Sequence, residues 1–376
     1  MVIVGAGVGG LALASGLVSS GHRVRVLERA PAPRTDGAAV TIFSNGAAAA
    51  AGLGAPLDGL GGTIDSLTFC LSDGRRFVRT DLRVMRARTG FGVATVPRAA
   101  ILDRFAAALP PGTIAYGQEI TSVTVRPDGV SIVDGTGAEQ VADVVVGADG
   151  YRSAVRKAVL GGAPATRNGW VSWQGLTAAV PEVAQSTHAR CLVGPAGLCG
   201  LMPAGGGLLQ WWFDVPEPAP QGQPVVDWLR TRFADYAEPV DKLLAGLSEA
   251  DVQEFPHVLH EVRDEWGHGP ATLLGDAAHA FPPSQAQGAN QALEDAWLLR
   301  RALDAPGPVA STLRRYERLR GRRVRRIAKL AASEVTNRPP SALARAGGRL
   351  LGPGAMGRIY LATIRRCSSV LNDERI

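Results

Sequence analysis

Three glycines near the start of the chain have the spacing of a phosphate-binding turn. Gly5, Gly7 and Gly10 form a GxGxxG motif directly after the β-branched run 2–4. In such a turn the first glycine allows a tight bend, the second lets a pyrophosphate approach the backbone, and the third lets helix and strand pack closely. The helix N-terminus that follows would face the phosphate charge. The chemistry predicted by this motif is dinucleotide binding.

The surrounding pattern supplies the elements that such a turn needs. Residues 11–18 read as a helix, Gly21 ends it, and residues 23–27 alternate as a second strand that closes on Glu28. A carboxylate at this place, 18 residues after Gly10, can accept hydrogen bonds from an adenosine ribose. Strand, helix, strand and acid occur in the order of a βαβ dinucleotide-binding unit. The motif alone does not distinguish FAD from NAD.

A second segment places polar residues at the end of a strand. The buried run 144–146 ends at Gly147, Asp149 begins a turn, and Ser153 and Arg156 lie on the helix that follows. By itself this pattern predicts no more than an aspartate near a helix N-terminus.

A third segment repeats that arrangement with more chemistry. Asp276 follows a strand, where a carboxylate facing a dinucleotide can bind polyol hydroxyls. Gly288 opens a helix and can present backbone N–H groups to an electron-rich ring. We expect His279 to be a buried structural histidine, and Glu294 and Asp295 to lie on a solvated helix face.

Composition narrows the class of protein. A chain of 376 residues with 46% hydrophobic and 20% charged residues predicts a folded protein of two or three domains. No apolar run reaches the ~18 residues of a membrane span. Four cysteines without a CxxC pair indicate a reducing cytoplasm and no disulfide framework, and we expect no metal site.

The net charge of +6 is concentrated in one segment. Residues 314–329 hold nine basic side chains and one glutamate, so the rest of the chain carries a net charge of −2. We predict a helix over residues 313–332 with a narrow apolar side at Leu319, Val324, Ile327 and Leu330. A nucleic-acid or acidic-membrane site is one interpretation. A solvated arginine-rich helix is the interpretation that we expect, with neither nucleic acid nor membrane as partner.

The three motifs, in this order, resemble those of the single-component, class A FAD-dependent aromatic hydroxylases, the p-hydroxybenzoate hydroxylase-like family. The resemblance covers most of residues 1–330. It implies an α/β fold in which a Rossmann-like FAD-binding domain of the glutathione-reductase type is interleaved with a β-sheet substrate domain. The FAD-binding domain would comprise residues 1–65, 94–160 and 265–300, the substrate domain residues 66–93 and 165–264, and a C-terminal helical region residues 301–376.

The resemblance also implies a role for individual residues in FAD binding. The implied contacts are the pyrophosphate with Gly5, Gly7 and Gly10; the adenosine with Glu28, Arg29 and Ile120; the flavin with Ala39, Val40 and Arg98; the ribityl chain with Asp276; and the isoalloxazine ring with Gly288, Ala289 and Asn290. Asp149 would support both FAD and the transient nicotinamide cofactor.

Two positions depart from the family pattern. Ala286 stands where many relatives have glycine, and its Cβ could stiffen the loop beside the flavin. Gln174 stands where the family strand often carries arginine, and because glutamine cannot neutralise a carboxylate, a carboxylated substrate is less expected. The candidate substrate contacts are Gln174, Trp212 and Pro283, and alternation predicts one of Trp211 and Trp212 in the core and one outside.

The reaction that the resemblance implies is monooxygenation. NADPH or NADH would reduce bound FAD, dioxygen would form a flavin hydroperoxide, and its distal oxygen would pass to an aromatic or polyketide-like ring. No catalytic base stands out, and an electron-rich substrate would need none. Epoxidation, N-hydroxylation or halogenation on the same fold, and a flavin-binding protein without turnover, are the alternatives. We expect a cytoplasmic monomer or homodimer whose partners are an aromatic small molecule and dioxygen.

Overall fold

A five-stranded parallel sheet carries the dinucleotide motif at its centre. The computed structural model describes residues 1–33, 38–126, 129–162, 164–216 and 220–375. In this sheet the order is β18-β12-β1-β2-β8, with strands β1 (Val2–Val4), β2 (Arg25–Glu28), β8 (Ile114–Tyr116), β12 (Val145–Gly147) and β18 (Ala271–Leu273). Because parallel strands place their carboxyl ends at one edge, the residues after β1, β12 and β18 meet there.

Helices cover this parallel sheet. Helix α1 (Val8–Ser19) follows β1 and packs against α10 (Gly288–Asp304), and both contribute to one large apolar core. The remaining helices of this half are α2 (Ser44–Gly52), α4 (Arg98–Ala106), α5 (Ala154–Leu160) and α9 (Asp276–His279). The predicted helix 11–18 and strand 23–27 are both present, with boundaries shifted by one to three residues.

Two small antiparallel sheets flank the parallel one. One has the order β3-β7-β4, with β3 (Ala39–Ile42), β4 (Gly62–Thr63) and β7 (Ala94–Pro97). The other has the order β11-β10-β9, with β9 (Ile120–Arg126), β10 (Gly129–Asp134) and β11 (Glu139–Ala142). The first of these sheets joins the two halves of the molecule, because β7 and β4 both contact strand β15 (Gly197–Gly205) of the larger sheet.

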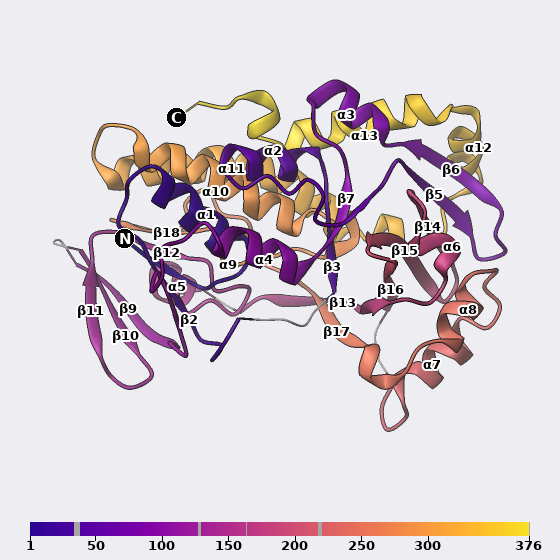
Figure 1. Ribbon diagram of the computed structural model, residues 1–376, viewed down its shortest axis with the longest axis horizontal. Coiled ribbons are helices and arrows are strands. Elements are labelled where there is room, and N and C mark those ends of the chain that lie inside the picture. The colour runs from indigo at the N-terminus through magenta and orange to yellow at the C-terminus, as the bar shows by residue number, and fades with distance from the viewer. Residues whose placement is uncertain (34–37, 127–128, 163, 217–219, 376) are drawn as a thin grey trace.

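A seven-stranded sheet forms the other half of the molecule (Figure 1). Its order is β17-β13-β16-β15-β14-β5-β6, with β5 (Ser66–Leu71), β6 (Arg76–Asp81), β13 (Thr166–Thr177), β14 (His188–Gly194), β16 (Leu208–Pro216) and β17 (Gln253–Leu259). The short elements around it are α3 (Arg83–Thr89), α6 (Pro181–Ala184), α7 (Val225–Arg232), α8 (Val240–Ala245) and the 3₁₀ turn η1 (Glu249–Asp251).

The two faces of this sheet differ in chemistry because side chains alternate along each strand. Trp211 and Phe213 of β16 are fully buried in a core shared with α7 and α8. Gln210, Trp212 and Asp214 therefore lie on the opposite face. That face carries the polar groups of the sheet, and Gln210 there contacts strand β3.

The C-terminal quarter of the chain is helical and lies along the top of the molecule in Figure 1. It consists of α11 (Val309–Ala332), α12 (Ala342–Leu350) and α13 (Pro353–Cys367), with the 3₁₀ turns η2 (Pro283–Gln285), η3 (Val335–Asn337) and η4 (Val370–Asn372) nearby. Helix α13 packs on β6 and α3, whereas η4 packs on α2 and α10, so the C-terminal segment contacts both halves. The α/β class and the interleaving of the two halves are confirmed.

The arginine-rich helix is less solvated than predicted. Its apolar side includes Leu313, Tyr316 and Ala331 in addition to Val324 and Ile327, and is therefore wider than expected. Arg320 is fully buried, whereas we expected the arginines of this helix to be solvated. The physical reason is that α11 packs on α10, where two buried carboxylates receive this guanidinium.

Candidate active site

The turn after β1 has the geometry that a bound pyrophosphate requires. Gly5 has φ +107°, and a Cβ there would lie 2.4 Å from the carbonyl oxygen of Ala148. A Cβ on Gly10 would lie 2.1 Å from the carbonyl oxygen of Gly5, so both positions exclude a side chain. A Cβ on Gly7 would meet no atom within 4 Å. The space beside Gly7, at the start of α1, is therefore open to a ligand, and its backbone N–H donors fit a phosphate.

Glu28 is held at the carboxyl end of β2, beside this turn. Its carboxylate accepts hydrogen bonds from the backbone N–H of Ala6 (2.7 Å) and of Ala30 (2.9 Å). These bonds orient the carboxylate, which keeps further lone pairs for ribose hydroxyls. Arg29, the next residue, is exposed. The Gln118 N–H donates to the Glu28 carbonyl oxygen (2.8 Å), and Ile120, two residues later, begins β9. The predicted adenosine contacts thus lie at the same edge of the sheet.

The second motif stabilises the next helix start. One oxygen of Asp149 accepts from the Ser153 hydroxyl (2.5 Å) and the other from the Ala154 N–H (2.7 Å). Arg156 is buried and donates to the carbonyl oxygens of Ala277 (3.0 Å) and Ala278 (2.8 Å) in α9. The Asp149 motif therefore fixes the short helix that begins with Asp276, and the sequence pattern alone did not reveal this link.

Asp276 and the start of α10 present free surface at the same sheet edge. Asp276 is exposed at the first position of α9, directly after Gly275 with φ +57°. A Cβ on Gly288 would meet no atom within 4 Å, so the N-terminus of α10 is also open. The first N–H groups of a helix have no intrahelical acceptor and can donate to a ring carbonyl or nitrogen.

Asn290 is placed differently from its neighbours. It is fully buried, accepts from the Phe43 N–H (2.8 Å), and donates to the carbonyl oxygens of Thr41 (2.9 Å) and Ala286 (2.8 Å). Its side chain therefore joins α10 to strand β3 and leaves only its backbone N–H for a flavin. Ala286 has φ +49°, a left-handed conformation that a glycine would adopt without strain.

The predicted flavin strand and the substrate sheet meet through neutral amides. The Ala39 N–H donates to Gln210 Oε1 (2.5 Å), and Gln210 Nε2 donates to Gln174 Oε1 (3.2 Å). Gln174 and Trp212 are direct neighbours across β13 and β16, and the Trp212 ring lies over Gly200. These side chains form an amide-and-indole face that adjoins strand β3.

Other predicted residues lie around this face. Val40 and Arg98 are partly buried at β3 and at the start of α4, where the Arg98 N–H donates to the Ala38 carbonyl oxygen (3.4 Å). Pro283 begins η2 and is exposed, whereas the preceding Pro282 is buried. Trp211 is in the core and Trp212 is only partly buried, which confirms the predicted alternation.

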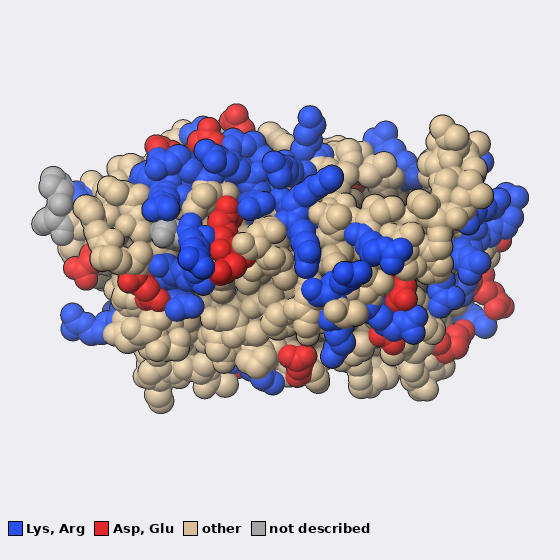
Figure 2. Space-filling view, turned by 90° about the horizontal axis from the view of Figure 1, so that it is seen from above, with Lys and Arg blue, Asp and Glu red and all other residues tan. Residues whose placement is uncertain are grey.

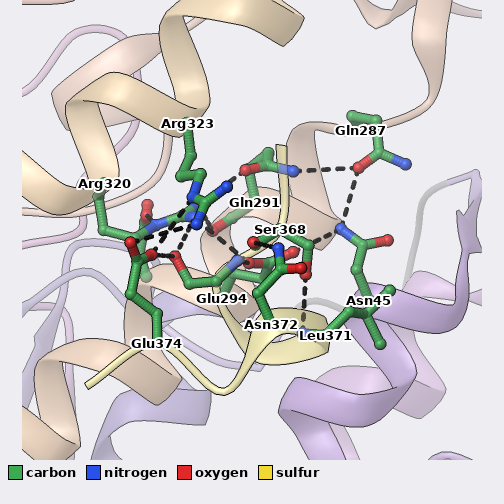
Figure 3. Close-up of polar contacts among 12 residues, drawn as sticks. Asn45, Gln287, Gln291, Glu294, Arg320, Arg323, Ser368, Leu371, Asn372 and Glu374 are labelled. Carbon is green, nitrogen blue, oxygen red and sulfur yellow. Dashed lines mark hydrogen bonds and ion pairs between the residues drawn. The ribbon is translucent and has the colours of Figure 1, made fainter. Parts of the chain in front are cut away.

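A buried ionic network lies behind the loop 286–290 (Figure 3). Arg320 donates to Asp295 (2.7 Å), to Glu294 (3.3 Å) and to Gln291 Oε1 (2.7 Å), and all four residues are fully buried. Gln291 in turn donates to Gln287 Oε1 (3.1 Å), at the start of α10. The prediction that Glu294 and Asp295 are solvated is therefore wrong, because α1, α2 and α11 cover α10 on several sides.

The network links α10 to α2 and to the C-terminal turn. Glu294 also accepts from Asn45 Nδ2 (2.8 Å) and from the Ser369 N–H (2.5 Å) near the C-terminus. Burial raises the pKa of Glu294, and the Arg320 charge opposes that change. Burial would also raise the pKa of Asp295, but His279 and Arg320 outweigh it and lower that pKa to about 2.

His279 is the buried structural histidine that we predicted. Its Nε2 lies 2.6 Å from Asp295, and its ring packs on Trp266 with centroids 5.2 Å apart. A second buried histidine, His257, lies between Asp214 and Glu334, with Nδ1 2.7 Å from Glu334. Burial would lower the pKa of His257, but these carboxylates outweigh it and raise the pKa to about 9.

Known proteins match this chain over most of its length. A family described as FAD binding domain matches residues 1–331. A FAD-dependent urate hydroxylase of Klebsiella pneumoniae subsp. pneumoniae is 31% identical over 334 residues, 86% of each chain. A 3-amino-4-hydroxybenzoate 2-monooxygenase of Streptomyces cremeus is 34% identical over 351 residues, 87% of this chain and 86% of that one.

Solved structures agree with these relatives. The crystal structure of Klebsiella pneumoniae HpxO complexed with FAD and uric acid has a TM-score of 0.88 and 28% identity, and the match covers 97% of this chain and 96% of that one. The open turns at Gly7 and Gly288 and the exposed Asp276 fit FAD as the cofactor of this protein. The protein is an FAD-dependent monooxygenase, and the chain belongs to the family of class A FAD-dependent aromatic hydroxylases.

Proposed function

We propose that the protein hydroxylates a small, electron-rich heteroaromatic ring whose edge carries N–H and C=O groups. The observation that supports this most is the neutral amide pair Gln210–Gln174 on the sheet face that adjoins strand β3. Amides both donate and accept, so they match a lactam-like edge, whereas they leave a carboxylate without a counter-charge. Among the relatives, the substrate named for urate hydroxylase is of this kind.

The FAD contacts that we propose follow the open positions of the structure. The pyrophosphate would lie at Gly5, Gly7 and Gly10; the adenosine at Glu28, Arg29 and Ile120; the flavin and its ribityl chain along Ala39, Val40, Arg98, Asp149 and Asp276; and the ring at the N-terminus of α10, residues 288–290. Bound FAD, once reduced by NADPH or NADH, supplies an electrophilic oxygen atom derived from dioxygen.

The chain itself contributes positioning and exclusion of water. Gln174, whose amide oxygen accepts a hydrogen bond from the buried Gln210, would orient the substrate ring through its own N–H groups, and the Trp212 indole would pack on the ring's face. Pro283 in η2 would lie at the edge of the same site. We also propose that the chain segments named in the sequence analysis form the FAD-binding, substrate and C-terminal helical domains, and that the enzyme acts in the cytoplasm.

A substrate panel tests this proposal. The purified yellow protein is mixed with NADPH or NADH and, in turn, with urate, an oxo-quinoline, 3-amino-4-hydroxybenzoate and salicylate, and the NAD(P)H oxidation rate and product mass are measured. We expect the lactam-bearing rings to accelerate oxidation most and to gain one oxygen atom. Acceleration by the two benzoates alone would contradict the amide argument, whereas an epoxide or N-hydroxylated product would assign one of the alternative reactions.

A charge change on the sheet face sharpens the test. Gln174→Arg introduces a cation beside Trp212, so the preference should move toward the carboxylated rings by on the order of tenfold in kcat/KM. The matched control is Gln185→Arg, the same change at an exposed position after α6. If both variants keep the original preference, Gln174 does not face the substrate.

A further inference from the structure

Helix α12 lies on the seven-stranded sheet without burying any of its own side chains. It approaches β6 through Gly348, where a Cβ would lie 2.5 Å from Val78 Cγ2 and 2.7 Å from the Phe77 carbonyl oxygen. Its leucines point away from this contact, since Leu343 is 84% and Leu350 is 87% exposed. The helix therefore turns its small residues toward the protein and its large apolar residues toward the outside.

Exposed apolar side chains are concentrated in this region. Of the seven large hydrophobic residues that are exposed in the described part of the chain, four lie within residues 343–359: Leu343, Leu350, Leu351 and Ile359. Scattered exposed leucines are ordinary, but Leu343, Leu350 and Leu351 lie on α12 or directly after it, and such a group marks an interaction surface.

The charged side chains between residues 335 and 372 are all basic. Residues 335–372 contain six arginines and neither aspartate nor glutamate. A groove of about 540 Å³ runs beside the contact of α12 with β6 and is lined by Arg76, Arg79, Arg349 and Leu350, among others. In Figure 2 most of the basic side chains in view gather over α11, and others lie at the end of the molecule formed by α12 and β6.

We propose that α12 and the adjoining edge of β6 dock onto an anionic phospholipid surface. The exposed leucines would enter the interfacial region, while Arg76, Arg79 and Arg349 would bind headgroup phosphates. This contact is peripheral, since none of the helices in the described ranges is long and apolar enough to cross a bilayer. It goes beyond the proposed reaction and revises the expectation from the sequence that no membrane is involved.

A second copy of the chain is a poorer occupant of this surface. A two-fold interface brings each patch against itself, so arginine would face arginine. The neighbouring acids do not relieve this repulsion, because Asp73 is already paired with Arg75 (2.6 Å) and Asp81 with Arg83 (2.9 Å). A lipid surface supplies negative charge and apolar volume together.

Vesicle flotation of the FAD-bound protein tests the proposal. We expect it to float with phosphatidylcholine vesicles that contain phosphatidylglycerol, to stay behind with pure phosphatidylcholine, and to be released at high salt. The double variant Leu343→Asp/Leu350→Asp should reduce binding more than tenfold, since each leucine contributes its burial in the interface. Arg79→Ala and Arg349→Ala should each weaken binding about fivefold.

Controls distinguish binding through this surface from nonspecific adsorption to vesicles. Val141→Asp introduces one carboxylate in place of an exposed apolar side chain, at a residue that is 61% exposed on β11, and it should leave binding unchanged. All variants should keep the flavin spectrum and the thermal midpoint of the parent protein. The proposal is overturned if flotation is absent, if neutral vesicles bind equally well, or if the leucine double variant binds like Val141→Asp. It is also overturned if sedimentation shows a dimer that the double variant dissociates, which would assign this surface to a second copy.

Discussion

Replacing Arg320 by methionine should destabilise this FAD-dependent monooxygenase more than the same replacement of any exposed arginine. The guanidinium is fully buried and lies between two fully buried carboxylates, at 2.7 Å from Asp295 and 3.3 Å from Glu294. Methionine fills much of the same volume but removes the charge, so two carboxylates remain buried without their cation. Breaking a buried ion pair in this way costs about 3–5 kcal/mol, and for a chain of this length we expect the thermal midpoint to fall by about 4–6 °C.

The matched control is Arg322→Met, two residues further along the same helix at an exposed position. An exposed arginine contributes at most ~1 kcal/mol, so its midpoint should move by no more than about 2 °C. Both variants are measured by thermal unfolding with saturating FAD, so that ligand binding contributes equally.

The pH dependence identifies the cause of the loss. Burial already raises the pKa of the Glu294 carboxyl, and the loss of the Arg320 charge should raise this pKa further. A carboxyl with a raised folded-state pKa favours the folded state while it is protonated and disfavours it as pH rises. The loss of unfolding free energy caused by Arg320→Met should therefore be smaller near about pH 5 than near about pH 8. The reasoning is refuted if Arg320→Met is as stable as Arg322→Met, or if its deficit does not change with pH.

Three further outcomes follow from the same geometry. Gly10→Ala should destabilise the apoprotein, because its Cβ would lie 2.1 Å from the Gly5 carbonyl oxygen. Gly7→Ala has open space around it, so it should leave apoprotein stability unchanged and weaken FAD binding by on the order of tenfold. Calorimetry of the apoprotein and of the FAD-titrated protein separates the two effects, and an unchanged FAD affinity in Gly7→Ala would show that no phosphate lies there. The pKa of His257 is raised from 6.5 to about 9, so its ion pairs stabilise the folded state fully below pH 6.5 and lose that contribution as the pH rises through about 9. The urea midpoint of the parent protein should therefore fall over this pH range, and that of His257→Asn should change less. Identical pH profiles of the two proteins would contradict the ion pairs. Ala286→Gly should raise the free energy of unfolding by about 1 kcal/mol, because Ala286 has φ +49°, and a loss of stability on denaturant titration would speak against the left-handed conformation.

Local sequence patterns predicted much of the cofactor half. The turn at Gly5–Gly10 needs only a strand, a tight bend and a helix, all adjacent in the chain, and these form as predicted. The helix start at Gly288 and the alternation of Trp211 and Trp212 are local features of the same kind. The substrate half was less predictable, because the face of a strand that meets the flavin depends on packing. Gln210, which links Ala39 to Gln174, was missed for this reason, although its place opposite Trp211 in the alternation was a usable signal.

The sequence by itself determined the order of the phosphate-binding turn and the two later motifs, because backbone geometry and residue spacing act over short stretches of chain. The family and the cofactor followed from the resemblance that these motifs carry. Only the tertiary structure decided where the charges lie. Glu294 and Asp295 resemble solvated helix residues in sequence, yet they are buried because Arg320 of a later helix meets them. The outward leucines of α12 likewise follow from Gly348 packing on Val78, a contact between residues 270 positions apart that no local pattern encodes. Burial and ion pairing depend on which distant segments meet, and that is a property of the folded chain.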